Sequence, residues 1–285
     1  MQICRTKSEI REVVSAWREE GRTIGLVPTM GALHQGHLSL LDISGKNAAR
    51  TAASIFINPL QFAPHEDFES YPRDLEADYQ KLQERGCDVV FAPERAALFA
   101  DDFSTNISVG GLGENHCAIT RPHFFDGVAT IVAKLFMIVK PDIAVFGEKD
   151  FQQLAVIRRM VRDLDIDVRI FAGPILRETD GLAMSSRNMY LTPDERAAAP
   201  ALQQTLLSAA RAAIAPDAGW EKIRTSAVQS LRDAGFGEID YVNLVDAASL
   251  EEIERADRPA RILAAAWMGR TRLIDNVPAG PGDPG

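Results

Sequence analysis

The segment that most constrains the fold spans residues 23–41, TIGLVPTMGALHQGHLSLL. Its first part, residues 24–27, is a short apolar run typical of a buried strand in a parallel sheet. Gly31 and Gly36 permit a tight turn and a close approach of the backbone to a ligand. The leucines from Leu38 onward predict a helix. The segment therefore predicts a strand–turn–helix unit, from which parallel α/β sheets are built.

Two histidines stand at the predicted start of this helix. His34 and His37 are two of only five histidines in the chain. A helix N-terminus offers unpaired N–H groups and a positive dipole end, which suit a phosphate, and imidazoles add further donors. No Cys or further His lies nearby at ligand spacing, so a zinc site is disfavoured. The alternative is a pair of ordinary surface histidines.

Apolar strands and amphipathic helices alternate up to about residue 175, which predicts a parallel α/β sheet. The predicted strands are 24–27, 51–58, 88–91, 142–146 and 167–172, and the predicted helices are 8–20, 38–41 onward, 74–85, 127–139 and 152–164. Ser8 is the predicted N-cap of the first helix. The Gly-, Asn-, Ser- and Thr-rich stretch 104–121 predicts a short edge strand followed by a mobile segment.

The pattern changes after about Leu176. Thr192-Pro-Asp-Glu195 is a capping-box start for one helix running to about Ile214, and a second helix covers 220–234. Strands at 239–245, 261–267 and 272–274 predict a small antiparallel sheet. The predicted organisation is a domain over 1–175, a second domain over 176–278 and a disordered Pro/Gly-rich tail over 279–285.

Composition limits the partners. With 46% hydrophobic and 25% charged residues, the chain has the profile of a soluble globular protein. Its net charge of −9 argues against nucleic acid as a partner. Three cysteines without C-x-x-C spacing favour a reducing, cytoplasmic location. No apolar run approaches the length of about 18 residues needed for a membrane span, so no membrane partner is expected.

Four polar clusters follow predicted strands: 29–37, 58–61, 147–153 and 184–188. Ligands of open parallel sheets bind at the carboxyl ends of the strands, so the clusters are predicted to converge on one crevice. Lys149 offers a point charge for a phosphate, although it could be an ordinary solvated lysine.

The remaining polar groups of these clusters fit an oxygen-rich ligand and a small acid. Asp150 suits a ribose hydroxyl or a helix cap. Residues 185–187, Ser-Ser-Arg, suit a pyrophosphate but could be a polar linker. The amides of Gln61 and Gln153 could bind a small hydroxy acid.

The chain lacks a P-loop and a G-x-G-x-x-G opening its first helix, but it carries another signature. Residues 28–37, PTMGALHQGH, resemble the HIGH signature of the nucleotidylyltransferase superfamily, and 184–188, MSSRN, resemble its KMSKS counterpart. More narrowly, the chain resembles the pantoate–β-alanine ligase (pantothenate synthetase) family. The matching segments are 26–37, 54–62, 71–73, 141–154, 181–188 and 273–276.

This resemblance implies an α/β fold: a Rossmann-like parallel sheet with helices on both faces, plus a smaller C-terminal α+β domain with a short antiparallel sheet. It implies ATP-dependent condensation of (R)-pantoate with β-alanine to give pantothenate. Pantoyl adenylate and pyrophosphate form first, and β-alanine then displaces AMP. Mg²⁺ would accompany ATP, and the enzyme would be a cytoplasmic homodimer.

The resemblance also assigns residues. His37 matches the proton donor, and His34, Lys149 and Arg187 complete the implied catalytic set. Gln61 and Gln153 match pantoate-binding glutamines, with Asn58 beside them. The implied ATP contacts are Met30, Gly31, Ala32, Leu33, His34, Gln35, Gly36, His37, Gly147, Glu148, Lys149, Asp150, Leu176, Met184, Ser185, Ser186 and Arg187. No residue is assigned as a direct metal ligand, and Asp78 is a candidate for the outer shell of Mg²⁺.

One segment departs from the family pattern Ser-Arg-Pro-Gly-His-Phe-Arg-Gly-Val. Residues 120–128 here read TRPHFFDGV, so His123 stands at the glycine position and Asp126 replaces a basic residue. Two other functions stay open: a related nucleotidylyltransferase with a phosphate-ester acceptor, and a nucleotide-binding regulator without catalysis. The first would want Arg or Lys near Gln61, and residues 58–62 contain none. The intact histidine, lysine and arginine positions argue against the second.

Overall fold

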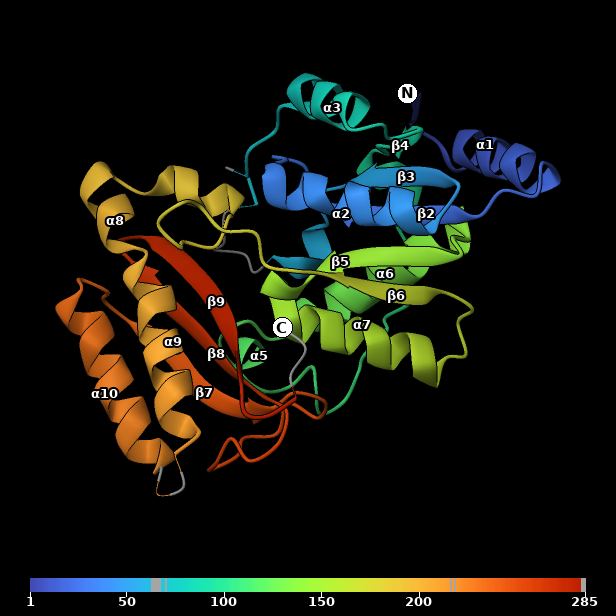
Figure 1. Ribbon diagram of the computed structural model, residues 1–285. Coiled ribbons are helices and arrows are strands. Elements are labelled where there is room, and N and C mark those ends of the chain that lie inside the picture. Colours follow the sequence, from blue (N-terminus) through green and yellow to red (C-terminus); the bar gives the residue numbers. More distant parts are fainter. Residues whose placement is uncertain (63–67, 70, 216, 218, 283–285) are drawn as a thin grey trace. The chain divides into compact units, whose positions relative to one another are not determined.

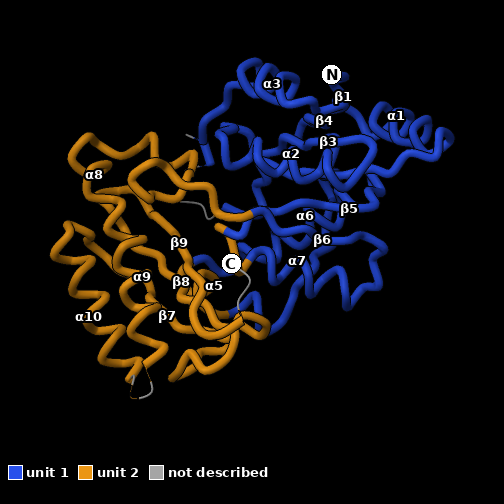
Figure 2. Tube along the Cα trace, in the orientation of Figure 1, with its two compact units in different colours: residues 1–114, 121–148, 153–173 blue, residues 115–120, 149–152, 174–285 orange. Residues whose placement is uncertain are grey.

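A computed structural model describes residues 1–62, 68–69, 71–215, 217 and 219–282 (Figure 1). The chain forms two compact units (Figure 2). Unit 1 comprises residues 1–114, 121–148 and 153–173, and unit 2 comprises 115–120, 149–152 and 174–285. The junction between residues 173 and 174 lies close to the predicted one, but the two short inner segments of unit 2 were not predicted.

Unit 1 is built on a six-stranded sheet in the order β1-β4-β3-β2-β5-β6, with all neighbours parallel. The strands are β1 (Gln2–Cys4), β2 (Ile24–Thr29), β3 (Arg50–Ile55), β4 (Val89–Phe91), β5 (Ile143–Gly147) and β6 (Arg169–Gly173). The helices are α1 (Lys7–Glu19), α2 (Gln35–Asn47), η1 (Pro59–Gln61), α3 (Leu75–Glu84), α4 (Arg95–Leu98), α6 (Phe124–Val139) and, shared with unit 2, η2 (Glu148–Asp150) and α7 (Phe151–Asp163).

Helices cover both faces of this sheet, as the family resemblance implied. The connections through α2 and α3 lead toward the β1 edge of the sheet, whereas those through α1, α6 and α7 lead toward the β6 edge. Because parallel crossovers are almost always right-handed, the two groups lie on opposite faces. Figure 1 shows α2 lying along β2 and β3. Leu38 and Leu41 of α2 pack there with Val27 and Val90, so the apolar side of the helix sets where its N-terminus lies.

Two predictions for unit 1 were wrong. The N-cap of α1 is Thr6 instead of Ser8, because Thr6 Oγ1 accepts from Glu9 N (3.2 Å) while Glu9 Oε2 accepts from Thr6 N (3.1 Å). No strand lies in 104–121, which the structure describes fully as loops, turns and the short α5 (Cys117–Thr120). The edge strand next to β4 is instead β1, whose three residues are too few to give an alternating pattern.

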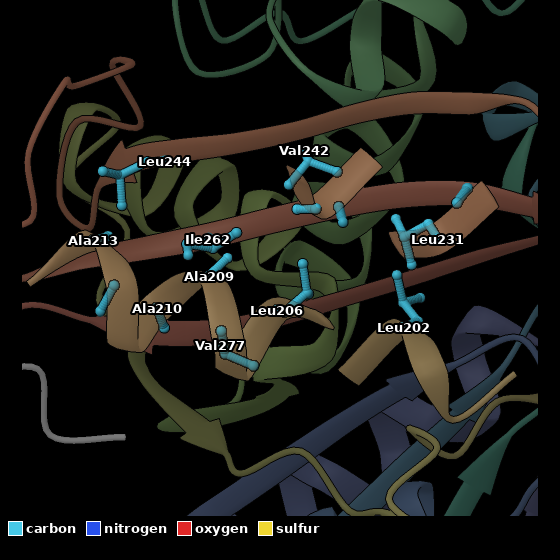
Figure 3. Packing of buried hydrophobic residues seen from close by; sticks show 14 of the residues in the cluster. Leu202, Leu206, Ala209, Ala210, Ala213, Leu231, Val242, Leu244, Ile262 and Val277 are labelled. Carbon is cyan, nitrogen blue, oxygen red and sulfur yellow. The ribbon is translucent and has the colours of Figure 1, made fainter. Parts of the chain in front are cut away.

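Unit 2 joins α5 to a three-stranded antiparallel sheet covered by helices. The elements are η3 (Ser186–Tyr190), α8 (Pro193–Ala198), α9 (Ala201–Ala213), α10 (Trp220–Asp233), β7 (Ile239–Asp246), β8 (Ala260–Met268) and β9 (Thr271–Ala279). In the core of unit 2, Leu206 of α9 and Leu231 of α10 pack with Ile262 and Val277 of the sheet (Figure 3). The predicted antiparallel sheet is therefore confirmed.

Two details differ from prediction. The single helix predicted from Thr192 to Ile214 is split between α8 and α9 at Pro200, which has no N–H to continue an α-helical ladder. The tail prediction was wrong at Ala279, the last residue of β9, and residues 283–285 of that tail lie outside the described residues. Pro278 is accommodated because β9 is an edge strand. None of the helices in the described ranges is long and apolar enough to cross a membrane.

Candidate active site

The loop between β2 and α2 is held by a buried carboxylate of α3. Asp78, 2% exposed, accepts from Ala32 N through Oδ2 and from Leu33 N through Oδ1, each at 2.8 Å. Lys81 Nζ donates to the Leu33 carbonyl at 2.8 Å. Gly31 has a φ of +87°, and a Cβ there would lie 3.0 Å from Asp78 Oδ2. The loop therefore needs a glycine at this point and has a fixed backbone.

These contacts give Asp78 a structural role, while its place in the outer shell of Mg²⁺ stays a prediction. Both carboxylate oxygens already accept loop N–H groups, so Asp78 orders the segment predicted to bind a nucleotide. Burial raises the pKa of Asp78, although the bonds from Leu33 and Ala32 act in the opposite direction. Residue spacing alone gave no sign of this role, because the partners lie more than 40 positions apart in the chain.

Replacing Asp78 with asparagine is expected to destabilise the fold most at acidic pH. The variant loses one of two buried acceptors, a cost of about 1–3 kcal/mol. Because the pKa of Asp78 is raised in the folded state, this residue stabilises the parent fold most at pH values below the ordinary aspartate pKa of about 3.9. This contribution to the free energy of unfolding is lost as the pH rises through the folded-state pKa. The difference in unfolding free energy between parent and variant, measured by urea titration, should therefore be smaller at pH 7 than at pH 3.5. Glu84→Gln, an exposed change on the same helix, is the control, and a pH-independent difference would contradict the prediction.

The two histidines lie at the N-terminus of α2, as predicted. His34 is the N-cap, and its Nδ1 accepts from Gly36 N at 3.1 Å. His37 Nδ1 accepts from His34 N at 3.4 Å, and the two ring centroids are 4.1 Å apart. A ring nitrogen that accepts a hydrogen bond carries no proton, so the neutral imidazoles hold theirs on Nε2. The helix cap thus fixes both the orientation and the tautomer of the pair.

Two predicted substrate-binding amides form a buried cluster after β3. Asn58 Nδ2 donates to Gln61 Oε1 at 3.1 Å and to the Gly127 carbonyl at 3.0 Å. Gln61 Nε2 lies 2.9 Å from the sulfur of Met30, in the predicted nucleotide loop. Asn58 is 1% exposed and Gln61 is 8% exposed. The structure therefore brings Met30, Asn58 and Gln61 together within unit 1.

The segment that departs from the family pattern adjoins this cluster. Arg121 Nη2 donates to the Gln61 carbonyl at 3.0 Å, and its guanidinium carbon lies 3.8 Å from the centre of the Phe124 ring. Phe124 stands where the pattern has histidine. His123 has a φ of +67°, a conformation that favours the glycine of the pattern, and its side chain is 87% exposed. Sequence reasoning therefore missed Arg121 as the residue of this segment that contacts Gln61.

The other predicted residues of unit 1 follow β5. Gly147 ends that strand, Glu148 opens η2, and Gln153 lies on α7, all half-buried. Gln152, the neighbour of Gln153, is buried and belongs to unit 2, where its side chain contacts Asn115 O (2.7 Å) and Cys117 N (3.2 Å).

Unit 2 carries two further predicted segments. Lys149 and Asp150 are half-buried, and the Lys149 carbonyl accepts from Asn276 Nδ2 at 3.0 Å. Met184 N donates to the Leu176 carbonyl at 3.0 Å, at the start of the Ser-Ser-Arg loop. Ser185 is the N-cap of η3, and its Oγ accepts from Arg187 N at 3.3 Å. Ser186 and Arg187 are half-buried.

Each unit therefore gathers its own part of the predicted site. The convergence of all four clusters on one crevice involves residues of both units and stays a prediction. Among the described residues, no group of three or more His, Cys, Asp or Glu side chains is arranged to hold a metal ion.

Comparisons with known proteins identify the family. The family model described as pantoate–β-alanine ligase matches residues 2–278. A pantothenate synthetase of Caulobacter vibrioides is 52% identical over 98% of both chains, and one of Paramagnetospirillum magneticum is 51% identical over 99% of both. The crystal structure of pantothenate synthetase from Thermus thermophilus matches with a TM-score of 0.92 and 41% identity, covering 99% of this chain and 100% of that one.

A solved structure with ligands also matches. It is a pantoate–β-alanine ligase from Francisella tularensis, complexed with β-γ ATP and β-alanine; its TM-score is 0.81 and its identity 29%, over 97% of both chains. The family match spans the strand–turn–helix unit with its two histidines, the amide cluster, and both segments of unit 2. The chain belongs to the pantoate–β-alanine ligase family.

Proposed function

We infer that the chain catalyses the ATP-dependent condensation of (R)-pantoate with β-alanine to pantothenate, as an AMP-forming ligase. Its membership of the family supports the overall reaction. The observation that carries the chemistry is the N-terminus of α2, where two backbone-bonded imidazoles hold their protons on Nε2. A helix N-terminus with two fixed donors suits the phosphate of ATP.

In the first step, a pantoate carboxylate oxygen attacks the α-phosphorus of ATP, and the bond to pyrophosphate breaks. Negative charge grows on the phosphate oxygens during this displacement. The Nε2–H groups of His34 and His37 donate hydrogen bonds that stabilise that charge. Lys149 contributes a point charge, and Arg187 contributes a planar fork of donors. Because the His37 ring is held through Nδ1, its Nε2–H donor is oriented before the reaction and needs no reorganisation during it.

The remaining proposed ATP contacts come from both units. In unit 1 they are the loop residues Met30, Gly31, Ala32, Leu33, Gln35 and Gly36, with Gly147 and Glu148. In unit 2 they are Asp150, Leu176, Met184, Ser185 and Ser186. The loop backbone bonded by Asp78 is preorganised for a ligand, because its two N–H bonds to the carboxylate fix Ala32 and Leu33.

In the second step, the β-alanine amine attacks the acyl carbon of pantoyl adenylate, loses a proton, and displaces AMP. The proposed pantoate ligands are Gln61 and Gln153, with Asn58 orienting Gln61 through the 3.1 Å bond between their amides. An amide both donates and accepts, which fits a substrate carrying a carboxylate and hydroxyls. The sulfur contact of Gln61 with Met30 joins the amide cluster to the nucleotide loop.

Mg²⁺ is proposed to arrive as the ATP complex, bound mainly by phosphate oxygens and water, where it would neutralise phosphate charge. Without a cluster of three acidic, histidine or cysteine side chains in the described part of the chain, the donors fit that mode better than a protein-ligated ion. We also propose a cytoplasmic homodimer, which the family resemblance supports. Light scattering should then give twice the chain mass of 31.2 kDa.

Pantoate-dependent exchange of labelled pyrophosphate into ATP tests the proposed function. With pantoate, ATP and Mg²⁺ but no β-alanine, exchange is expected because acyl-adenylate formation is reversible. Adding β-alanine should then release AMP and pantothenate. Absence of exchange with pantoate, in a protein that is folded and binds ATP, would contradict the proposal. Exchange with a phosphate ester in place of pantoate would favour the related nucleotidylyltransferase.

A further inference from the structure

Two neighbouring residues of β9 contact both segments of unit 2 that carry proposed ATP ligands. Asp275 and Asn276 are 4% and 2% exposed, so their polar atoms are sheltered from water. Adjacent residues of a strand project to opposite faces of a sheet. The two side chains can therefore serve two different segments from one rigid strand.

Asn276 contacts the segment of Lys149. Its Nδ2 donates to the Lys149 carbonyl at 3.0 Å, and its Oδ1 accepts from Arg261 Nη1 at 2.7 Å. Arg261, from β8, is 3% exposed, and its guanidinium carbon lies 4.3 Å from the centre of the Phe151 ring. Lys149 and Phe151 are thus both held from the same pair of strands, one through its backbone and the other through its ring.

Asp275 contacts the segment that leads to the Ser-Ser-Arg loop. Its two oxygens form paired bonds with Arg177, at 2.7 Å to Nη1 and 3.0 Å to Nη2. Arg177 Nη1 also donates to the Gly181 carbonyl at 3.0 Å, and the backbone of Arg177 forms a bridge with Ala183. Ala183 directly precedes Met184. The ion pair therefore fixes the base of the loop that presents Ser185 and Arg187.

We propose that Asp275 and Asn276 are a positioning pair that sets the placement of Lys149 relative to the Ser185–Arg187 loop. The proposal rests on the proposed ATP roles of those residues. Neither member of the pair needs to touch ATP. A displacement of about 1 Å in a catalytic group can lower a rate about 100-fold, so a buried strand that holds both segments acts directly on the rate of adenylation.

Asn276→Asp tests the proposal with almost no change of shape. The aspartate keeps an oxygen for Arg261 but cannot donate to the Lys149 carbonyl. Its kcat for pantoate-dependent exchange is expected to fall about 30- to 100-fold, with less than about a threefold change in KM for ATP, because Lys149 acts mainly on the transition state. Asn276→Ala should lose both side-chain hydrogen bonds, and its kcat should fall at least as far as that of Asn276→Asp. Deuterium uptake by amides over residues 148–152 should rise in both variants.

Asn243→Ala is the matched control. Asn243 is also a buried asparagine of the same sheet, 7% exposed, but its amide contacts His116 (2.9 Å) and Glu252 (2.7 Å). It should lose comparable stability with kcat within about threefold of the parent. A folded Asn276→Asp enzyme with parental kcat and parental deuterium uptake would overturn the proposal, as would an equal loss of kcat in the control. If the parent enzyme shows no exchange, the ATP assignment fails, while the deuterium measurement still tests the contact itself.

Discussion

Replacing His37 with glutamine is expected to lower the rate of pantoate-dependent ATP–pyrophosphate exchange on the order of 1,000-fold, with little loss of stability. Glutamine at this third helical position can accept from the His34 N–H, as in a capping box, so the cap is retained. While Oε1 of the glutamine caps the helix, its amide N–H cannot occupy the position of the imidazole Nε2–H, and loss of one well-placed donor to a developing anionic oxygen costs about 100- to 1,000-fold. Radiolabel exchange and thermal unfolding of the same preparation measure both quantities.

Two companion variants separate catalysis from capping. His37→Ala removes the donor and the cap together, so it should lose similar activity and, in addition, about 1 kcal/mol of stability. His123→Gln removes an imidazole that is 87% exposed and should leave both quantities unchanged. If His37→Gln retained parental exchange while His37→Ala lost both activity and stability, the pair would be only a helix cap.

The strand–turn–helix unit was predictable because its signals are local. The apolar run of β2, the glycines and the leucines of α2 are each legible within a few residues, and the structure places His34 and His37 at the predicted helix terminus. The same holds for Thr192 and Glu195, whose capping box lies within four residues. Long helices and buried strands of both units were found for this reason.

The contacts that organise the site are not local, and the residue pattern did not reveal them. Asp78 bonds a loop about 45 residues earlier, and Asn276 bonds the Lys149 carbonyl across 127 positions. Buried polar residues of this kind have no periodicity to mark them. Only the resemblance to family segments pointed to residues 273–276, and it did so without a role. The short strand β1 was missed because its three residues are too few to show an alternating pattern.

Replacing Gly127 with alanine is expected to destabilise unit 1 and weaken pantoate binding together. Gly127 lies in α6, where a Cβ would overlap the Leu60 carbonyl group and lie 2.9 Å from Gln61 N. Because these are backbone atoms of η1, no side-chain rotation can relieve the overlap. Overpacking of this kind costs about 1–3 kcal/mol. Displacing η1 also disturbs the bond from Asn58 Nδ2 to the Gly127 carbonyl (3.0 Å), so the Gln61 amide loses its placement.

We expect KM for pantoate to rise about 10-fold, as a loss of about 1.4 kcal/mol in substrate binding would produce, with a smaller change in KM for ATP. Gly45→Ala in α2 is the matched control, because a Cβ there meets nothing within 4 Å. That helical change should instead stabilise the fold by about 0.5–1 kcal/mol. Urea unfolding and initial-rate kinetics on both variants measure the two effects. Equal stability of the variants, or an unchanged KM for pantoate in Gly127→Ala, would show that η1 can move without disturbing Gln61. The close approach of α6 to η1 is thus the feature through which helix packing sets the position of the Gln61 amide, the proposed pantoate ligand.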